Sequence, residues 1–253
     1  MTMLRFLATR HSLRVEAVSV LLLYAVYEAS RGFVAGSRRV AVDHARAVTS
    51  LERGLHAFVE PRVQHAAQAV PGLTALLGGA YLTLHLSVTA ALLLWLHQRR
   101  PAAYARIRTT LFIASAIALV VFVAFPTAPP RLAAIGVSDT VSGRHVNLDK
   151  GLISSLYNPF AAVPSLHMGY AVLVGATVTR HAQLRVARLA AVAYPVFVLF
   201  VIVATGNHFL FDAAAGTVVV AAGYLLALKL RQAQAARPSA RLRAASRRAA
   251  PAT

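Results

Sequence analysis

The chain has 253 residues, of which 58% are hydrophobic and only 13% are charged, with a mean hydropathy of +0.61. Soluble domains carry about 25% charged residues, so this composition excludes a disordered or fibrous protein and argues against a soluble globular one. The formal net charge of +18 comes almost entirely from arginines that separate long apolar runs, which is typical of a multi-span membrane protein and not of a nucleic-acid-binding surface.

In chain order, six segments are long and apolar enough to cross a bilayer, which takes roughly 20 residues in a helix. The first, Leu13 to Val34, is the weakest because it contains Glu16, Glu28 and Arg31, and an interfacial helix is its alternative. The others are Leu73 to Leu96, the runs between Arg108 and Arg131, between Lys150 and Arg180 and between Arg188 and Asp212, and Asp212 to Leu228. The sequence therefore predicts an all-α polytopic membrane protein with a bundle of six transmembrane helices.

The segments outside these spans have their own patterns. Asp43 to Val70 carries apolar residues at helical spacing among charges, which predicts short amphipathic helices on the membrane surface or over the end of the bundle. Residues 1–230 form the predicted membrane domain, and residues 231–253, rich in Ala and Arg, form a predicted disordered tail attracted to anionic lipid headgroups. In the six-span scheme, Arg and Lys are more numerous on the side of the membrane that holds the two termini. This predicts a protein of the cell membrane with both termini on the cytoplasmic side.

An ionisable residue inside a span is costly, and Asp212 is the clearest case. It follows His208 by four residues, so on a helix its carboxylate would accept a hydrogen bond from one imidazole nitrogen. That bond would fix the tautomer and leave the other nitrogen as a nucleophile. The alternative is a structural His–Asp pair that packs a helix end.

A second candidate element is the segment Pro164-Ser165-Leu166-His167, which is typical of a helix start. The N-terminus of a helix attracts phosphate, and His167 would lie in its first turn. In the six-span scheme His167 and His208 open different spans on the same outer face. This agreement in depth favours a joint catalytic site over two unrelated structural histidines.

A bound phosphoryl group also needs cations, and three lie in the loop that leads to His167. Arg131 follows the stiff segment Pro126-Thr127-Ala128-Pro129-Pro130, and its planar guanidinium suits phosphate. The alternative for Arg131 is ordinary interfacial snorkelling, and Arg144 and Lys150 are weaker candidates for the phosphate-binding role.

These residues resemble the motifs of the type 2 phosphatidic acid phosphatase superfamily. Pro164 to His167 is similar to its second motif and His208 to Asp212 to its third, while Phe125–Leu132 and Thr205–Gly216 resemble its branch that includes inositol phosphorylceramide synthases. The resemblance implies an integral membrane lipid phosphatase or phosphotransferase that acts on lipid phosphate esters through a phosphohistidine, without a metal or other cofactor. It also implies transfer of a phospho-head group such as inositol phosphate in that branch.

The resemblance assigns roles to individual residues. It makes His208 the nucleophile, Asp212 the residue that orients it and His167 the proton donor to the leaving alcohol, with Ser165 and nearby N–H groups on the phosphate oxygens. The chain departs from the family where a first-motif lysine and a third-motif Ser-Arg pair are usual, since Val201 and Ile202 stand in the latter position. Phosphate binding would then depend on Arg131, and on Arg144 or Lys150.

Other functions stay open at this point. A transporter or channel could use His167, His208 and Asp212 as a proton or anion pathway, and a serine hydrolase could use Ser165, although no Gly-x-Ser-x-Gly elbow surrounds it. A metal site made of the same His and Asp residues is a further alternative, whereas the absence of cysteine excludes thiolate ligands. His85, inside the second span, is interpreted as a polar bridge between helices.

Overall fold

The structure is a computed structural model, and it describes residues 12–33, 37–140 and 158–249. These residues form helices and loops, with no strand among them. The elements are α2 (Leu13–Phe33), α3 (Arg38–Gly54), α4 (Glu60–Gln68), α5 (Leu73–Arg99), α6 (Pro101–Ala124), the short 3-10 helix η1 (Pro130–Leu132), α8 (Leu166–His181), α9 (Arg185–Ala204) and α10 (Leu210–Ala249). The predicted all-α fold is confirmed.

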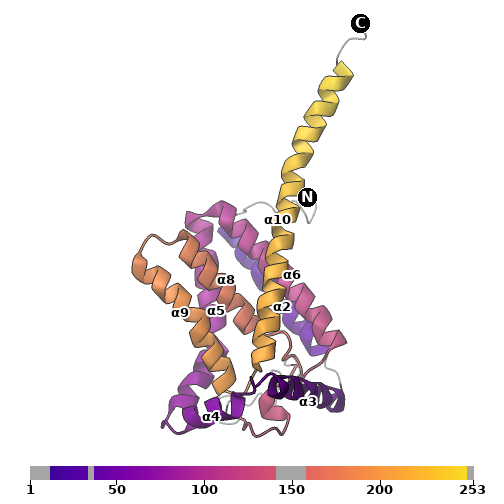
Figure 1. Ribbon diagram of the computed structural model, residues 1–253. Helices are drawn as coiled ribbons and strands as arrows, with labels where there is room; N and C mark the ends of the chain where they lie inside the picture. Colours follow the sequence, from indigo (N-terminus) through magenta and orange to yellow (C-terminus); the bar gives the residue numbers. More distant parts are fainter. Residues whose placement is uncertain (1–11, 34–36, 141–157, 250–253) are drawn as a thin grey trace.

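The long helices form a bundle, and the two amphipathic helices α3 and α4 lie across one end of it (Figure 1). α10 packs along α6 and α8, α8 also packs on α9, and α2 packs on α6. α3 turns one face inward because Ala41, Ala45, Val48 and Glu52 recur at helical spacing, and all four are buried. Glu52 is thus an acid in a stripe that is otherwise apolar.

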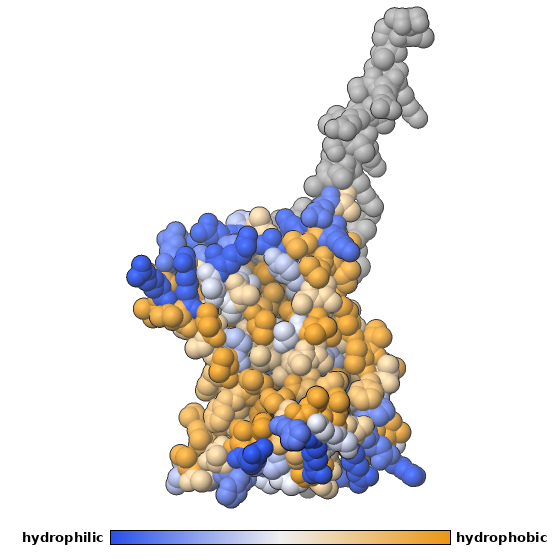
Figure 2. Space-filling model, viewed as in Figure 1, coloured by the Kyte–Doolittle hydropathy of each residue, from blue (hydrophilic) through white to orange (hydrophobic). Residues whose placement is uncertain are grey.

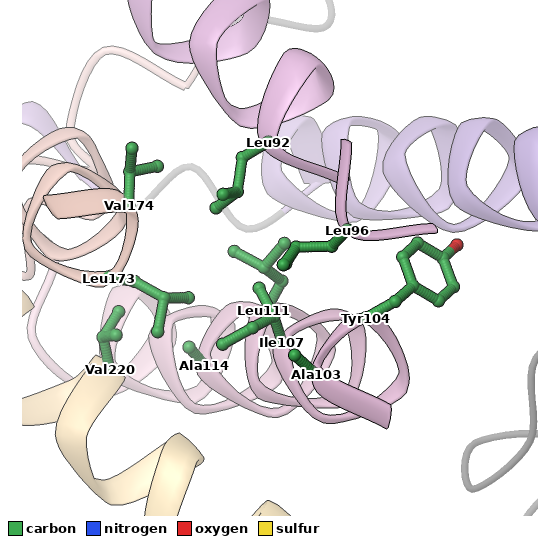
Figure 3. Packing of buried hydrophobic residues seen from close by; sticks show 10 residues of the cluster. All are labelled: Leu92, Leu96, Ala103, Tyr104, Ile107, Leu111, Ala114, Leu173, Val174 and Val220. Carbon is green, nitrogen blue, oxygen red and sulfur yellow. The ribbon is translucent and has the colours of Figure 1, made fainter. Parts of the chain in front are cut away.

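The main core fills the half of the bundle opposite α3 and α4. Its side chains come from four helices and interdigitate where α5, α6, α8 and α10 meet (Figure 3). They are Leu92, Leu96, Ala103, Tyr104, Ile107, Leu111, Ala114, Leu173, Val174 and Val220. This packing holds the ends of α8 and α10 in fixed positions relative to α5.

The outer surface has an apolar band across its middle and hydrophilic residues toward both ends (Figure 2). Among the described residues, four helices are long and apolar enough to cross a membrane: Leu73–Arg99, Pro101–Ala124, Arg185–Ala204 and Leu210–Gln234. The predicted count of six is therefore not confirmed. α8 has 16 residues and begins after its cap, Ser165, so the described part of the predicted span after Lys150, from residue 158 onward, is helical from Leu166. The division at residue 231 stays a prediction, and α10 runs through it.

α8 and α10 approach each other closely at their N-terminal ends. A Cβ on Gly216 would lie 1.9 Å from the carbonyl oxygen of Ser165, and a Cβ on Gly169 would lie 2.6 Å from that of Gly216. Only glycine allows this distance between the two backbones. The contact sets the start of α8 directly against the first turns of α10.

Candidate active site

A cavity of about 490 Å³ lies between α2, α5, α6 and α8. Its wall on α6 runs from Arg108 to Phe122, a stripe about 20 Å long at a rise of 1.5 Å per residue, and most of that stripe is apolar. Polar side chains gather toward the end that α3 and α4 cover, where His167, Asn207 and His208 line the cavity. The cavity therefore joins a long apolar channel to a compact polar end.

His208 lies in the turn before α10, two residues ahead of the first helical residue, Leu210. Its Nδ1 is 3.2 Å from Asp212 Oδ2 and 3.1 Å from the carbonyl oxygen of Ala162. Because both partners are acceptors, Nδ1 carries a hydrogen, and in the neutral ring the lone pair is then on Nε2. Nε2 has no hydrogen-bond partner among the described residues. The predicted pairing with Asp212 is present, but His208 stands before the helix and not on it.

His167 is the second residue of α8, and its ring centroid lies 5.7 Å from that of His208. Two side chains of α5 pack on the His167 ring: Tyr81 stacks on it at 4.3 Å between centroids, and His85 contacts it at 4.0 Å with a 56° tilt. All four rings line the cavity. Sequence reasoning missed Tyr81, whereas its interpretation of His85 as a polar bridge between helices agrees with the contact between α5 and α8. Their spacing of four residues in an apolar span was the available signal.

Three buried carboxyl groups accept hydrogen bonds from the backbone N–H groups at the start of α10. Asp212 Oδ2 accepts from Phe209 N–H at 2.9 Å, Glu60 Oε1 from Leu210 N–H at 3.0 Å, and Glu52 Oε1 from Phe211 N–H at 2.7 Å. The protein's own acids therefore occupy the first N–H donors of α10. Of the starts of α8 and α10, as far as the described residues show, that of α8 lines the cavity, through Leu166 and His167.

Ser165 and Asp212 lie behind the cavity wall. Ser165 caps α8 by accepting the Met168 N–H at 3.4 Å, and its own N–H donates to the carbonyl oxygen of Asp212 at 3.0 Å. Both side chains are fully buried. These bonds tie the two helix starts that carry His167 and His208 into one rigid unit.

Arg131 also lies behind the wall, next to the His208 turn. Its Nε donates to Asn207 Oδ1 at 3.0 Å, its N–H donates to the carbonyl oxygen of Gly206 at 3.0 Å, and its Nη1 pairs with Asp139. Gly206 has φ +67°, which glycine tolerates, and a Cβ there would lie 3.4 Å from that of Arg131. Arg131 thus braces the turn that carries His208.

The remaining predicted cations, Arg144 and Lys150, fall outside the described residues. Across residues 12–33, 37–140 and 158–249, no group of three or more His, Cys, Asp or Glu is arranged to hold a metal ion.

The family model of the PAP2 superfamily matches residues 46–226, well over half of the chain. The chain belongs to the PAP2 superfamily. No curated protein and no solved structure matches it. Membership of the PAP2 superfamily, together with four helices that can span a bilayer, makes this an integral membrane protein with a function of the lipid phosphatase or phosphotransferase type.

The PAP2 match also covers the two amphipathic helices from residue 46 onward, together with Glu52 and Glu60. Sequence analysis gave these two acids no role, although Glu52 lies on the apolar face of its helix. An acid on a buried face needs a partner, and that partner is the start of α10, about 150 residues away in the chain.

Proposed function

We propose that this protein transfers the phosphoryl group of a lipid phosphate ester through a covalent phosphohistidine on His208. The observation that carries the proposal is the state of the His208 ring. Two acceptors hold its Nδ1–H, its Nε2 has no hydrogen-bond partner among the described residues, and His208 lines the same cavity as a second imidazole, that of His167. An oriented neutral imidazole of this kind is a competent nucleophile.

The reaction has two steps that mirror each other. In the first, His208 Nε2 attacks phosphorus, the bond from phosphorus to the lipid alcohol oxygen breaks, and His167 gives that oxygen a proton. In the second, water or another alcohol gives its proton to His167 and attacks phosphorus, and the N–P bond breaks. Asp212 stabilises the positive charge that develops on His208 in each transition state, since its Oδ2 already bonds Nδ1.

For phosphate binding we propose the start of α8, with Ser165 at its cap, and Asn207 as an additional donor. Arg131 supports Asn207 through the bond from its Nε. A direct contact between Arg131 and phosphate stays a proposal, and Arg144 and Lys150 stay proposed ligands from the same loop. No metal or other cofactor takes part in the proposed steps.

We further propose that the acceptor is an alcohol, so that a phospho-head group such as inositol phosphate is transferred, as the resemblance to the synthase branch implies. The apolar stripe along α6 supports a lipid tail beside the histidines. The excess of Arg and Lys near the termini supports cytoplasmic termini, which places the histidines on the extracytoplasmic side.

The test uses purified protein, a ³²P-labelled phospholipid and quenching under alkaline conditions, which preserve phosphohistidine. Wild type should trap acid-labile label on His208. His208→Ala should trap none, and His167→Ala should trap label only slowly, whereas the exposed His65→Ala serves as the control and keeps full labelling. Products are then identified by mass spectrometry with and without inositol, glycerol or ceramide, and with a chelator present.

Three results would overturn the proposal. Undiminished turnover in both His208→Ala and His167→Ala would remove the histidines from the chemistry. Ion flux in vesicles without any phosphate release would favour a transporter that uses the same cluster. Loss of activity with the chelator would favour a metal site. Free phosphate as the sole product in the presence of every acceptor alcohol would limit the reaction to hydrolysis.

A further inference from the structure

Glu52 and Glu60 make a buried carboxyl pair at the outer side of the α10 N-terminus. Glu52 is 3% exposed and Glu60 is 0% exposed. Each uses one oxygen, Oε1, to accept a backbone N–H of α10, and in each the other oxygen, Oε2, is buried without a donor among the described residues. Leu210 and Phe211 are adjacent, so the two carboxyl groups lie next to each other at the start of α10. Two neighbouring buried carboxyl groups, each with an oxygen that lacks a donor, are favoured when one of them carries a proton.

The electrostatics of Glu52 agree with a shared proton. Burial raises its pKa from 4.5 to about 8, the Phe211 N–H opposes that rise, and the negative charges of Glu60 and Asp212 add to it. Two groups of α10 face Glu52: the carboxyl group of Asp212, which is itself bonded to His208, and the Phe211 N–H. From α4, Glu60 faces Glu52. The neighbouring cation Arg53 lies over the ring of Phe58, 5.0 Å from its centroid.

The pair is close to the proposed nucleophile in the chain but does not contact the cavity. Leu210 and Phe211, which the glutamates hold, follow His208 by two and three residues, and the same turn contains the Phe209 N–H that fixes Asp212. Any movement of this turn changes the direction of His208 Nε2. Glu52 and Glu60 therefore act through α10 and not on the substrate.

We propose that Glu52 and Glu60 are positioning residues whose single shared proton keeps the first turn of α10, and with it His208 and Asp212, in the reactive geometry. The inference rests on the proposed phosphohistidine reaction. When the proton is lost, three carboxylates face one another in a buried space beside an incoming phosphate. Their repulsion loosens the turn, so the reaction loses rate as the pH rises through the range in which the pair ionises.

The Glu52→Gln variant tests the shared proton, because glutamine keeps the hydrogen-bonding shape of a protonated Glu52 and cannot ionise. The amide oxygen can accept a hydrogen bond from the Phe211 N–H, and the amide N–H₂ can donate one to Glu60. The side chain that replaces Glu52 is then uncharged at every pH. Wild-type phosphohistidine formation should fall between pH 7 and 9, and in Glu52→Gln this alkaline fall should move up by at least one pH unit. Glu52→Ala, which loses the acceptor, should lower kcat at all pH values with little change in KM. The matched control is Asp43→Asn, an exposed acid on the same helix, whose profile should follow wild type.

A second measurement needs no turnover. Because the pKa of Glu52 is higher in the folded protein, its contribution to stability is complete below about pH 4.5 and is lost as the pH rises through about 8. The melting temperature of wild type and of Asp43→Asn should fall over this range, and that of Glu52→Gln should fall less.

The outcomes separate the two proposals. If wild type forms no phosphohistidine at any pH, the proposed function fails, and the melting curves still decide whether the shared proton exists. If wild type is active but Glu52→Gln has the same alkaline fall and the same melting curve as wild type, the positioning pair is wrong. A Glu52→Gln variant as inactive as Glu52→Ala at every pH would also overturn it, because the carboxylate and not the proton would then be required.

Discussion

A buried pair of an acid and a basic side chain lies near each end of the same cavity, and the two pairs differ in whether the basic side chain can react. At one end Arg108 pairs with Glu16, and Tyr104 donates to the same carboxylate at 2.8 Å. At the other end His208 pairs with Asp212. Both acids are buried, but a guanidinium stays charged at every working pH, whereas an imidazole can give up a lone pair and take a proton.

Burial and pairing alone therefore do not identify a reactive group. The Arg108–Glu16 pair joins α6 to α2 and can supply only charge, so we interpret it as an anchor for α2. The His208–Asp212 pair leaves one ring nitrogen of a cavity-lining residue without a partner among the described residues. Changes at the first pair should reduce stability, and changes at the second should reduce rate.

The largest expected effect is on rate, in Asp212→Asn. The amide keeps the shape of the carboxylate but not its charge, and its N–H₂ group can occupy the position that Nδ1–H needs, which favours the wrong tautomer of His208. Phosphohistidine formation should fall by about 10²- to 10⁴-fold. Stopped-flow or quench-flow labelling gives the rate, and an unchanged circular dichroism spectrum checks the fold. A rate within twofold of wild type would mean that Asp212 is structural.

The matched change at the opposite end of the cavity is Glu16→Gln. It leaves the buried Arg108 charge without its counter-ion, and removing one partner of a buried pair costs about 3–5 kcal/mol. The melting temperature in detergent should fall strongly, while the molecules that stay folded still form phosphohistidine. A stable Glu16→Gln protein that forms none would place the anchor inside the chemistry and remove the distinction between the two ends.

A smaller effect on both properties is expected where α8 meets α10. In Gly216→Ala the new Cβ would lie 1.9 Å from the Ser165 carbonyl oxygen, so the two backbones must separate. Such overpacking costs about 1–3 kcal/mol, and it also moves His167 away from His208. The control is Gly79→Ala, a helical glycine with no atom within 4 Å of the new Cβ, which should stabilise α5 slightly. Equal melting temperatures for the two variants would contradict the close approach.

Much of this arrangement follows from short-range patterns in the sequence. The spacing of His208 and Asp212 predicts their pairing, and Pro164 with Ser165 predicts the start of α8, because both signals act within one helical turn. The apolar spacing of Asp43 to Val70 likewise predicts amphipathic helices, and α3 and α4 are there.

What could not be predicted depends on contacts between distant segments. Glu60 meets Leu210 across 150 residues, and the Ala162 carbonyl meets His208 across 46. No local pattern encodes such a contact. The predicted count of six spans is not confirmed, for another reason. α2 carries charges and α8 is short, and hydropathy alone does not separate a short helix buried in a bundle from one that crosses the bilayer.

The smallest expected effect compares two histidines of α5, one near each end of the cavity. His85 packs on His167, and His97 packs edge-on against Tyr104 with 5.0 Å between centroids. Ring contacts of this kind are worth about 0.5–1.5 kcal/mol, which corresponds to roughly two- to tenfold in rate if the contact orients His167 in the transition state. His85→Gln should therefore lower kcat by that factor with little change in melting temperature.

His97→Gln should do the reverse, lowering the melting temperature while kcat stays at the wild-type value, because His97 touches the Tyr104 end and not the reacting rings. The two variants compare the His208 end of the cavity with its Arg108 end, since each change removes one imidazole from the same helix. If His85→Gln and His97→Gln changed kcat and stability in the same proportions, the His85 contact would be packing like any other. The imidazoles that take part in the proposed chemistry would then be limited to His167 and His208.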